Sequence, residues 1–311
     1  MIVSILLLVA GIALLYFGGE VLVDNSIRIA AHFGVSALVI GLTVVAFATS
    51  APELAATLTA AFKGVPDIAI GNVLGSNVAN LALILATAAI VMPLTTTKQF
   101  IRRELAFMVF VTVLAYPVMA TGLEIGRAEG FMLFVILLMF IAALLRNPGE
   151  AGEAQKTDDV EPRPLGLSVL GVVLGIGLLV GGAQALVSGA TQIALSLGVA
   201  ERIIGFTAVA IGTSLPELAA SIVAARKNEG DLVMGNIVGS NIFNILCILG
   251  ITPMVHPIAV APEALRLDFW MMLGISVLVA AMLAVNRRLE RWEGIFLLTI
   301  YVGYTVFLLM Q

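Results

Sequence analysis

Long apolar segments recur along the whole chain, and they constrain its fold more than any other feature. Ten of them approach ~20 residues, the length that an α-helix needs to cross a bilayer. A soluble fold is excluded because 60% of the 311 residues are hydrophobic and 12% are charged, against about 25% charged residues in soluble domains. The expected spans are 2–23, 36–62, 67–92, 104–121, 129–146, 165–190, 200–226, 231–254, 267–286 and 292–310.

The chain is also an internal repeat. The segment TVVAFATSAPELAATLTA, which begins at Thr43, aligns without a gap with TAVAIGTSLPELAASIVA from Thr207, and each aligned pair lies 164 residues apart, as Glu53 and Glu217 do. Five spans per copy, an odd number, turn the second copy upside-down relative to the first. The sequence therefore predicts an all-α membrane protein with ten transmembrane helices. They form two inverted five-helix repeats, residues 1–146 and 165–311, joined by a polar linker at 147–164.

The loop charges predict the orientation of the chain in the membrane. Cytoplasmic loops carry an excess of Lys and Arg. With the amino terminus outside, the inside loops receive 12 of the 16 Lys and Arg residues. We therefore expect a multi-pass membrane protein with both termini outside and the linker 147–164 cytoplasmic.

Two carboxylates fall in the middle of expected spans, Glu53 in ATSAPE and Glu217 in GTSLPE. A charge near the bilayer centre costs at least ~2.5–3.5 kcal/mol, so it must face a cavity or a partner. The preceding prolines lack an amide donor and should break helices 2 and 7. Such breaks expose carbonyl oxygens that bind cations. These carbonyls and the nearby hydroxyls are expected at Ala46, Thr49 and Ser50, and at Ala210, Thr213 and Ser214.

The helix that follows each break carries a polar stripe, GNVLGSNVAN from Gly71 and GNIVGSNIFN from Gly235. Its Asn and Ser side chains recur every four residues and so share one helix face: they are Asn72, Ser76 and Asn80, and Asn236, Ser240 and Asn244. Together with the two Glu residues they form an all-oxygen set, which suits hard cations such as Na⁺ and Ca²⁺, with Mg²⁺ and Mn²⁺ also compatible.

Other polar residues are expected to have structural roles. Asn in a membrane helix commonly makes contacts between helices, which we expect of Asn72, Asn77, Asn236 and Asn241. The glycine pairs Gly71–Gly75 and Gly235–Gly239 should let a neighbouring backbone approach closely. Glu20, Asp24 and Glu104 lie near the expected helix ends and should sit at the membrane interface.

The paired GTSxPE-like and GNxxGSNxxN motifs resemble the α-repeats of the calcium/cation antiporter superfamily, in its bacterial and archaeal sodium/calcium exchanger branch. The resemblance implies exchange of Na⁺ for Ca²⁺ by alternating access in the plasma (cell inner) membrane, without a cofactor. It implies ligands at twelve positions: Ala46, Thr49, Ser50, Glu53, Ser76, Asn80, Ala210, Thr213, Ser214, Glu217, Ser240 and Asn244. Family members often have Asp where this chain has Asn244, so this pocket would hold two negative charges rather than three.

Other functions remain open from the sequence. An antiporter that couples a divalent cation to H⁺ or K⁺ is the nearest alternative, although the proton-coupled branch lacks the GTSxPE form. A cation channel is less favoured, since selectivity filters usually come from rings of subunits. An intramembrane hydrolase would need a matched carboxylate dyad with an open water site, or His ligands. The formal net charge of −4 gives no support to nucleic-acid binding, and no protein partner is predicted.

Overall fold

The computed structural model describes residues 2–146, 163–197 and 212–310. The linker expected at 147–164 and the first part of the span expected at 200–226 therefore lie mostly outside the described residues. The first half contains α1 (Ile2–Phe33), α2 (Ala37–Ile40), the π-helical turn η1 (Gly41–Val45), α3 (Ala46–Thr49), α4 (Ala51–Phe62), α5 (Pro66–Ala79), η2 (Asn80–Ile84), α6 (Leu85–Val91), β1 (Leu94–Thr95), α7 (Lys98–Phe100), η3 (Ile101–Leu105), α8 (Ala106–Ala120), β2 (Glu124–Ile125) and α9 (Arg127–Arg146).

The second half repeats this order of elements. It contains α10 (Leu165–Ser196), α12 (Leu215–Arg226), α13 (Gly230–Phe243), η5 (Asn244–Ile248), α14 (Leu249–Val255), β3 (Ile258–Ala259), η6 (Ala264–Asp268), α15 (Phe269–Asn286), β4 (Arg288–Leu289) and α16 (Arg291–Leu309). The 164-residue offset seen in the motifs also relates α4 to α12, α5 to α13, and η2 to η5. The same offset thus extends from the sequence to the secondary structure.

The helices confirm a multi-pass membrane fold. Within the described residues, eight helices are long and apolar enough to cross a membrane, and a ninth span is the pair Ala37–Thr49 and Ala51–Phe62, bent by 40°. The break between them lies at Ser50, as Pro52 predicts, because the proline ring clashes with the carbonyl of the residue four positions earlier. The described part of the seventh expected span is α12, of 12 residues.

Two short antiparallel ladders join the halves at their loops. Leu94 of β1 pairs with Leu289 of β4, and Ile125 of β2 pairs with Ile258 of β3. Each ladder links one strand of the first half to one of the second, and the 164-residue offset converts one pairing into the other. These two-residue strands are a small departure from the expected all-α fold.

The helices that follow the breaks form the centre of the molecule. In the apolar 18-residue stretch of Gly230–Val255 every residue is buried, and in that of Pro66–Val91 78% are, whereas only 22% are buried in the corresponding stretches of α9 and α16. Tight packing of α13 depends on glycine: a Cβ on Gly235 would lie 2.5 Å from the carbonyl oxygen of Leu38. For Gly71 and Gly75 the expected close approach is not found among the described residues, where an added Cβ meets nothing within 4 Å.

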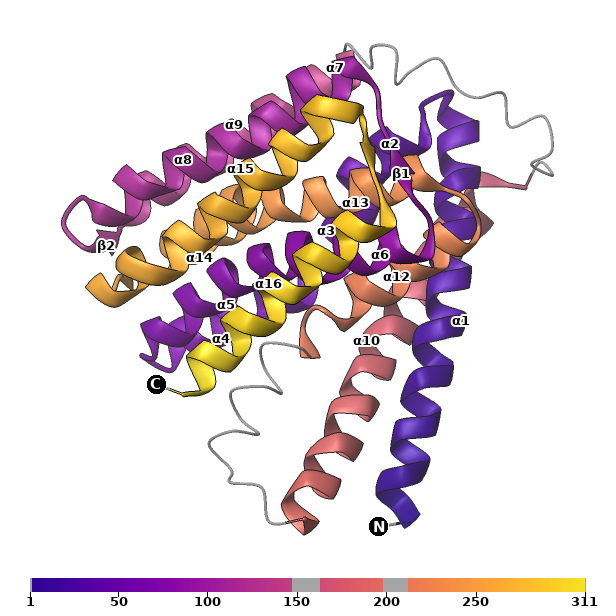
Figure 1. Cartoon of the computed structure of the whole chain (residues 1–311), viewed down its shortest axis with the longest axis horizontal. Helices are drawn as coiled ribbons and strands as arrows, with labels where there is room; N and C mark the ends of the chain where they lie inside the picture. Colours follow the sequence, from indigo (N-terminus) through magenta and orange to yellow (C-terminus); the bar gives the residue numbers. More distant parts are fainter. Residues whose placement is uncertain (1, 147–162, 198–211, 311) are drawn as a thin grey trace.

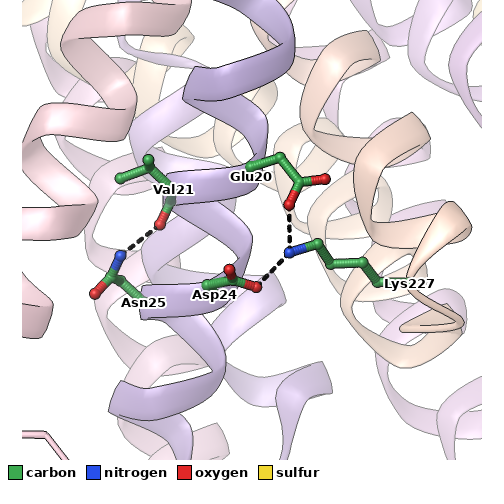
Figure 2. Close-up of polar contacts among 5 residues, drawn as sticks. All are labelled: Glu20, Val21, Asp24, Asn25 and Lys227. Atoms are coloured by element: carbon green, nitrogen blue, oxygen red, sulfur yellow. Dashed lines mark hydrogen bonds and ion pairs between the residues drawn. The ribbon is translucent and has the colours of Figure 1, made fainter.

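Helices α1 and α10 pack along each other as a separate pair beside the bundle (Figure 1). The structure corrects the expected end of the first span, because α1 continues to Phe33. Glu20 and Asp24 therefore lie within a helix rather than at its end. Lys227, directly after α12, contacts both carboxylates, with Nζ–O distances of 2.6 Å to Glu20 and 2.5 Å to Asp24 (Figure 2). This ion-pair cluster joins α1 to the second half of the chain.

Glu104 lies near the start of the fourth expected span, and its side chain is buried within the protein. It is 2% exposed in η3, and the Nε atom of Arg103 lies 2.8 Å from its Oε1. A buried carboxylate needs a partner of opposite charge, and the neighbouring arginine provides it.

Candidate ion-binding site

The two acidic residues singled out from the sequence occupy matching positions at the two helix breaks. Glu53 lies in the first turn of α4 and Glu217 in the first turn of α12. Their side chains are 1% and 2% exposed. A helix amino terminus is favourable for a carboxylate because its amide groups are not yet hydrogen-bonded and the helix dipole is positive there.

The two breaks meet face to face. The hydroxyl of Ser214 donates to Oε1 of Glu53 at 3.3 Å, and that of Ser50 donates to Oε1 of Glu217 at 3.4 Å. Each serine lies three residues before the carboxylate of its own half but bonds the carboxylate of the other half. Because O–H···O bonds are usually ~2.5–3.0 Å long, both contacts are loose. The arrangement brings both acids together around one buried centre.

A second reciprocal pair of contacts surrounds the carboxylates. The hydroxyl of Thr49 donates to Oδ1 of Asn236 at 3.2 Å, and that of Thr213 donates to Oδ1 of Asn72 at 3.4 Å. The asparagine amides are held in turn, since Nδ2 of Asn72 donates to Thr57 at 2.9 Å and Nδ2 of Asn236 donates to Ser221 at 3.2 Å. Asn72 and Asn236 thus fix the two threonines.

These asparagine contacts refine the sequence interpretation. Asn72 and Asn236 do make the expected contacts between helices, whereas the amides of Asn77 and Asn241 donate to the carbonyls of Val73 and Ile237 in their own helices. Sequence reasoning did not identify the supporting hydroxyls of Thr57 and Ser221. The internal repeat could have identified them, because Thr57 and Ser221 also lie 164 positions apart.

The polar stripes of α5 and α13 close the site. The Nδ2 atom of Asn244 donates to the hydroxyl of Ser76 at 3.1 Å. Asn80 and Asn244 each begin a π-helical turn, η2 and η5, a distortion that is frequent at functional sites. Both asparagines and Ser240 are buried, at 2% or less exposure.

Several of these buried oxygens have no hydrogen-bond partner in the described part of the chain. They are Oε2 of Glu53, Oε2 of Glu217, the hydroxyl of Ser240 and Oδ1 of Asn244. A buried polar atom without a partner is costly, and the two unpaired carboxylate oxygens at the facing breaks suit a positively charged ligand. No group of three or more His, Cys, Asp or Glu side chains that could hold a metal ion occurs among the described residues. The site is therefore two carboxylates among neutral oxygens.

Two of the expected ligands are backbone carbonyl groups, those of Ala46 and Ala210. The carbonyl of Ala46 accepts the backbone N–H of Ser50 at 3.0 Å and the hydroxyl of Thr49 at 3.5 Å, so the break does not free it as expected. Ala210 lies outside the described residues. Of the other ten expected residues, Ser50, Thr213 and Ser214 lie in the turns at the two breaks, and the remaining seven lie in the helices on either side of them.

Comparison with known proteins shows the family to which the whole chain is similar. The profile of a family described as "Sodium/calcium exchanger protein" matches residues 3–146 and 167–310. Over its full length the chain is 38% identical to "Inner membrane protein YrbG" of Escherichia coli, covering 97% of that protein. It is 34% identical to "Sodium/calcium exchanger MaX1" of Methanosarcina acetivorans, with 98% of each covered. The solved structure of the sodium-calcium exchanger NCX_Mj superposes with a TM-score of 0.85 at 31% identity, covering 98% of both chains.

Proposed function

We propose, on the premise that this chain belongs to the sodium/calcium exchanger protein family, that Glu53 and Glu217 jointly hold the ion that it carries. The protein is a membrane antiporter that exchanges Na⁺ for Ca²⁺, a transporter and not an enzyme. One observation carries the assignment of the site: Ser214 bonds Glu53 and Ser50 bonds Glu217, so the acids of the two halves face one buried centre.

Charge balance explains why such a site exchanges ions. Two ionised carboxylates buried without a cation would be strongly disfavoured, because an unpaired charge away from water is costly. One Ca²⁺ or two Na⁺ ions supply the compensating charge. The hydroxyls of Thr49, Ser50, Thr213 and Ser214 and the amide oxygens of Asn80 and Asn244 would complete an all-oxygen shell, the type that Ca²⁺ prefers. The filled site would change sides more readily than the empty one.

Ten spans in two inverted repeats are the topology that we propose. The two strand ladders support it, because paired strands must lie on the same side of the membrane. In the ten-span topology β1 and β4 follow the third and ninth spans, and β2 and β3 follow the fourth and eighth. Both members of each ladder then fall on one side. Lys227 follows the seventh span and contacts residues in the last part of the first span, α1, which also requires one side.

The loop charges support an assignment of the side of the membrane that faces the cytoplasm. Twelve of the 16 Lys and Arg residues lie in the loops that share a side with the linker 147–164, and cytoplasmic loops are rich in these residues. We propose that both termini face outward, that the linker is cytoplasmic, and that the protein resides in the plasma (cell inner) membrane. The relative in Escherichia coli is named an inner membrane protein, which supports this location.

Ion flux in proteoliposomes tests the coupling. Sodium-loaded vesicles diluted into sodium-free buffer should accumulate radiolabelled Ca²⁺, and an imposed H⁺ or K⁺ gradient alone should not drive that uptake. Competition by unlabelled Mn²⁺ and Mg²⁺ then ranks the divalent ions. Uptake driven by a proton gradient but not by sodium would assign the site to the proton-coupled alternative.

A further inference from the structure

A groove on the outer surface of the first half lies apart from the ion site. It has a volume of about 380 Å³, and it lies between the η3–α8 segment and α9. Phe107 and Phe140 are stacked in it, with ring centroids 4.5 Å apart and planes 2° from parallel. Small-molecule sites usually measure ~300–1,000 Å³ and are mostly apolar with a few polar groups, so the groove has the size and character of a binding site.

Along α9 the groove runs from Ile136 to Leu144, which at ~1.5 Å per residue is a length of about 12 Å. Met139 also lines it and is 58% exposed, so this surface faces outward from the bundle. An elongated apolar groove on the outer surface of a membrane helix pair matches a hydrocarbon chain in shape and chemistry.

The polar end of the groove is formed by Arg103. The Nε contact with the buried carboxylate of Glu104 fixes this guanidinium in place, and a guanidinium presents five N–H donors in a planar fork that matches phosphate oxygens. Arg102 precedes it in sequence, and Arg146 ends α9 two residues after Leu144; both are exposed. The apolar groove thus has one basic residue in its lining, Arg103.

The second half shows that the fold does not require this groove. At the 164-residue offset, Arg103 corresponds to Leu267 and Ala143, which lines the groove, corresponds to Phe307. Phe140 corresponds to Tyr304, whose hydroxyl donates to Asp268 at 2.6 Å. The counterpart surface therefore has neither the arginine nor the small residue.

We propose that this groove binds an anionic membrane phospholipid, with one acyl chain along Phe107, Phe140 and Ile136 and the phosphodiester at Arg103. The complementarity of charge selects the headgroup, because basic pockets between membrane helices attract anionic lipids. A lipid held here would bridge η3 and α9, which approach each other on the surface of the bundle.

Native mass spectrometry of the full chain in detergent tests the proposal. The protein would be titrated with phosphatidylglycerol and, separately, with phosphatidylcholine of the same acyl chains. We expect at least one phosphatidylglycerol molecule to bind about tenfold more tightly than phosphatidylcholine, since each basic residue near the headgroup favours an anionic lipid. Equal affinity for the two lipids would overturn the proposal.

Ala143→Phe locates the lipid, because it places in the groove the residue that the second half has at this position. We expect a loss of phosphatidylglycerol affinity of about tenfold. Leu145→Phe is the matched control: it adds a ring to the same helix at a position that is 59% exposed and does not line the groove, and it should bind as the native chain does. Unchanged binding by Ala143→Phe would refute the site. Arg103→Gln is unsuitable, since it strands Glu104 as a buried charge.

Discussion

At the residue scale, the chemistry depends on which carboxylate each hydroxyl bonds. Ser50 and Ser214 each donate to the carboxylate of the other half, so both halves contribute to the proposed site. Glu53 and Glu217 then share one centre, and each contributes a charge that no neighbouring neutral oxygen replaces. Asn72 and Asn236 influence the proposed site indirectly, because they accept hydrogen bonds from Thr213 and Thr49.

Replacement of either acid should abolish exchange. Glu53→Gln or Glu217→Gln removes one of the two charges that balance Ca²⁺, and contacts of this kind are worth ~1.5–3 kcal/mol each before the lost long-range attraction is counted. We expect sodium-dependent Ca²⁺ uptake to fall at least about 100-fold. Glu124→Gln, at an exposed position in β2, is the control and should transport normally. Substantial uptake by either buried variant would remove that acid from the site.

The supporting asparagines should affect affinity rather than the capacity for exchange. Asn236→Ala removes the contact that orients Thr49, and one neutral hydrogen bond contributes ~0.5–1.5 kcal/mol. We expect the Ca²⁺ concentration at half-maximal uptake to rise about three- to tenfold. Asn241→Ala is a matched control on the same helix, because its amide bonds only the carbonyl of Ile237 among the contacts described. A similar change in both variants would indicate a general packing effect.

At the scale of elements, α1 and α10 form a pair that is joined to the bundle by few polar contacts. The ion pairs of Lys227 with Glu20 and Asp24 tie α1 to the end of α12. Partial burial by itself would lower the pKa of Lys227, but the hydrogen bonds to Asp24 and Glu20 outweigh it and raise that pKa. In the first half, Lys63 stands at the equivalent place, where the counterparts of the two acids are Gln184 and Ser188. The repeat therefore does not reproduce the two acids for Lys63.

Lys227→Gln should weaken this one-sided contact. The side chains are 26–43% exposed, and exposed ion pairs contribute ~0.2–1 kcal/mol, so we expect a fall of a few degrees in the melting temperature of the purified protein. Because the folded-state pKa of Lys227 is raised, the stabilisation is present below the ordinary lysine pKa and is lost as the pH rises through the raised value. Lys63→Gln is the control. An equal effect of both substitutions would contradict a specific role for the ion pairs.

At the scale of the whole molecule, the two strand ladders and the loop charges agree on one topology. Each ladder joins loops that the ten-span arrangement puts on the same side, and the side that carries the linker also carries most of the Lys and Arg residues.

Cysteine labelling tests that topology. In a chain whose Cys247 is replaced by Ser, we expect Thr121→Cys to react with a membrane-impermeant maleimide added to intact cells. Thr95→Cys should react only after the membrane is permeabilised. Both positions are exposed, so access to the reagent depends on the side of the membrane. The reverse pattern would invert the proposed orientation.

The sequence by itself predicted a multi-pass helical fold, the repeat and the acid pair, because each rests on local chemistry. Apolar runs of bilayer length, a proline before each Glu, and a constant offset of 164 residues need no knowledge of partners. Contacts between distant segments were decided only by tertiary structure. The packing of the two halves brings the hydroxyl of Ser214 to Glu53 and that of Thr49 to Asn236. In the folded chain the carbonyl of Ala46 also stays hydrogen-bonded to Ser50. Tertiary structure also decided the length of α1 and the ion pairs of Lys227. Glu20 and Asp24 can continue the helix because Lys227, from another element, supplies their counter-charge.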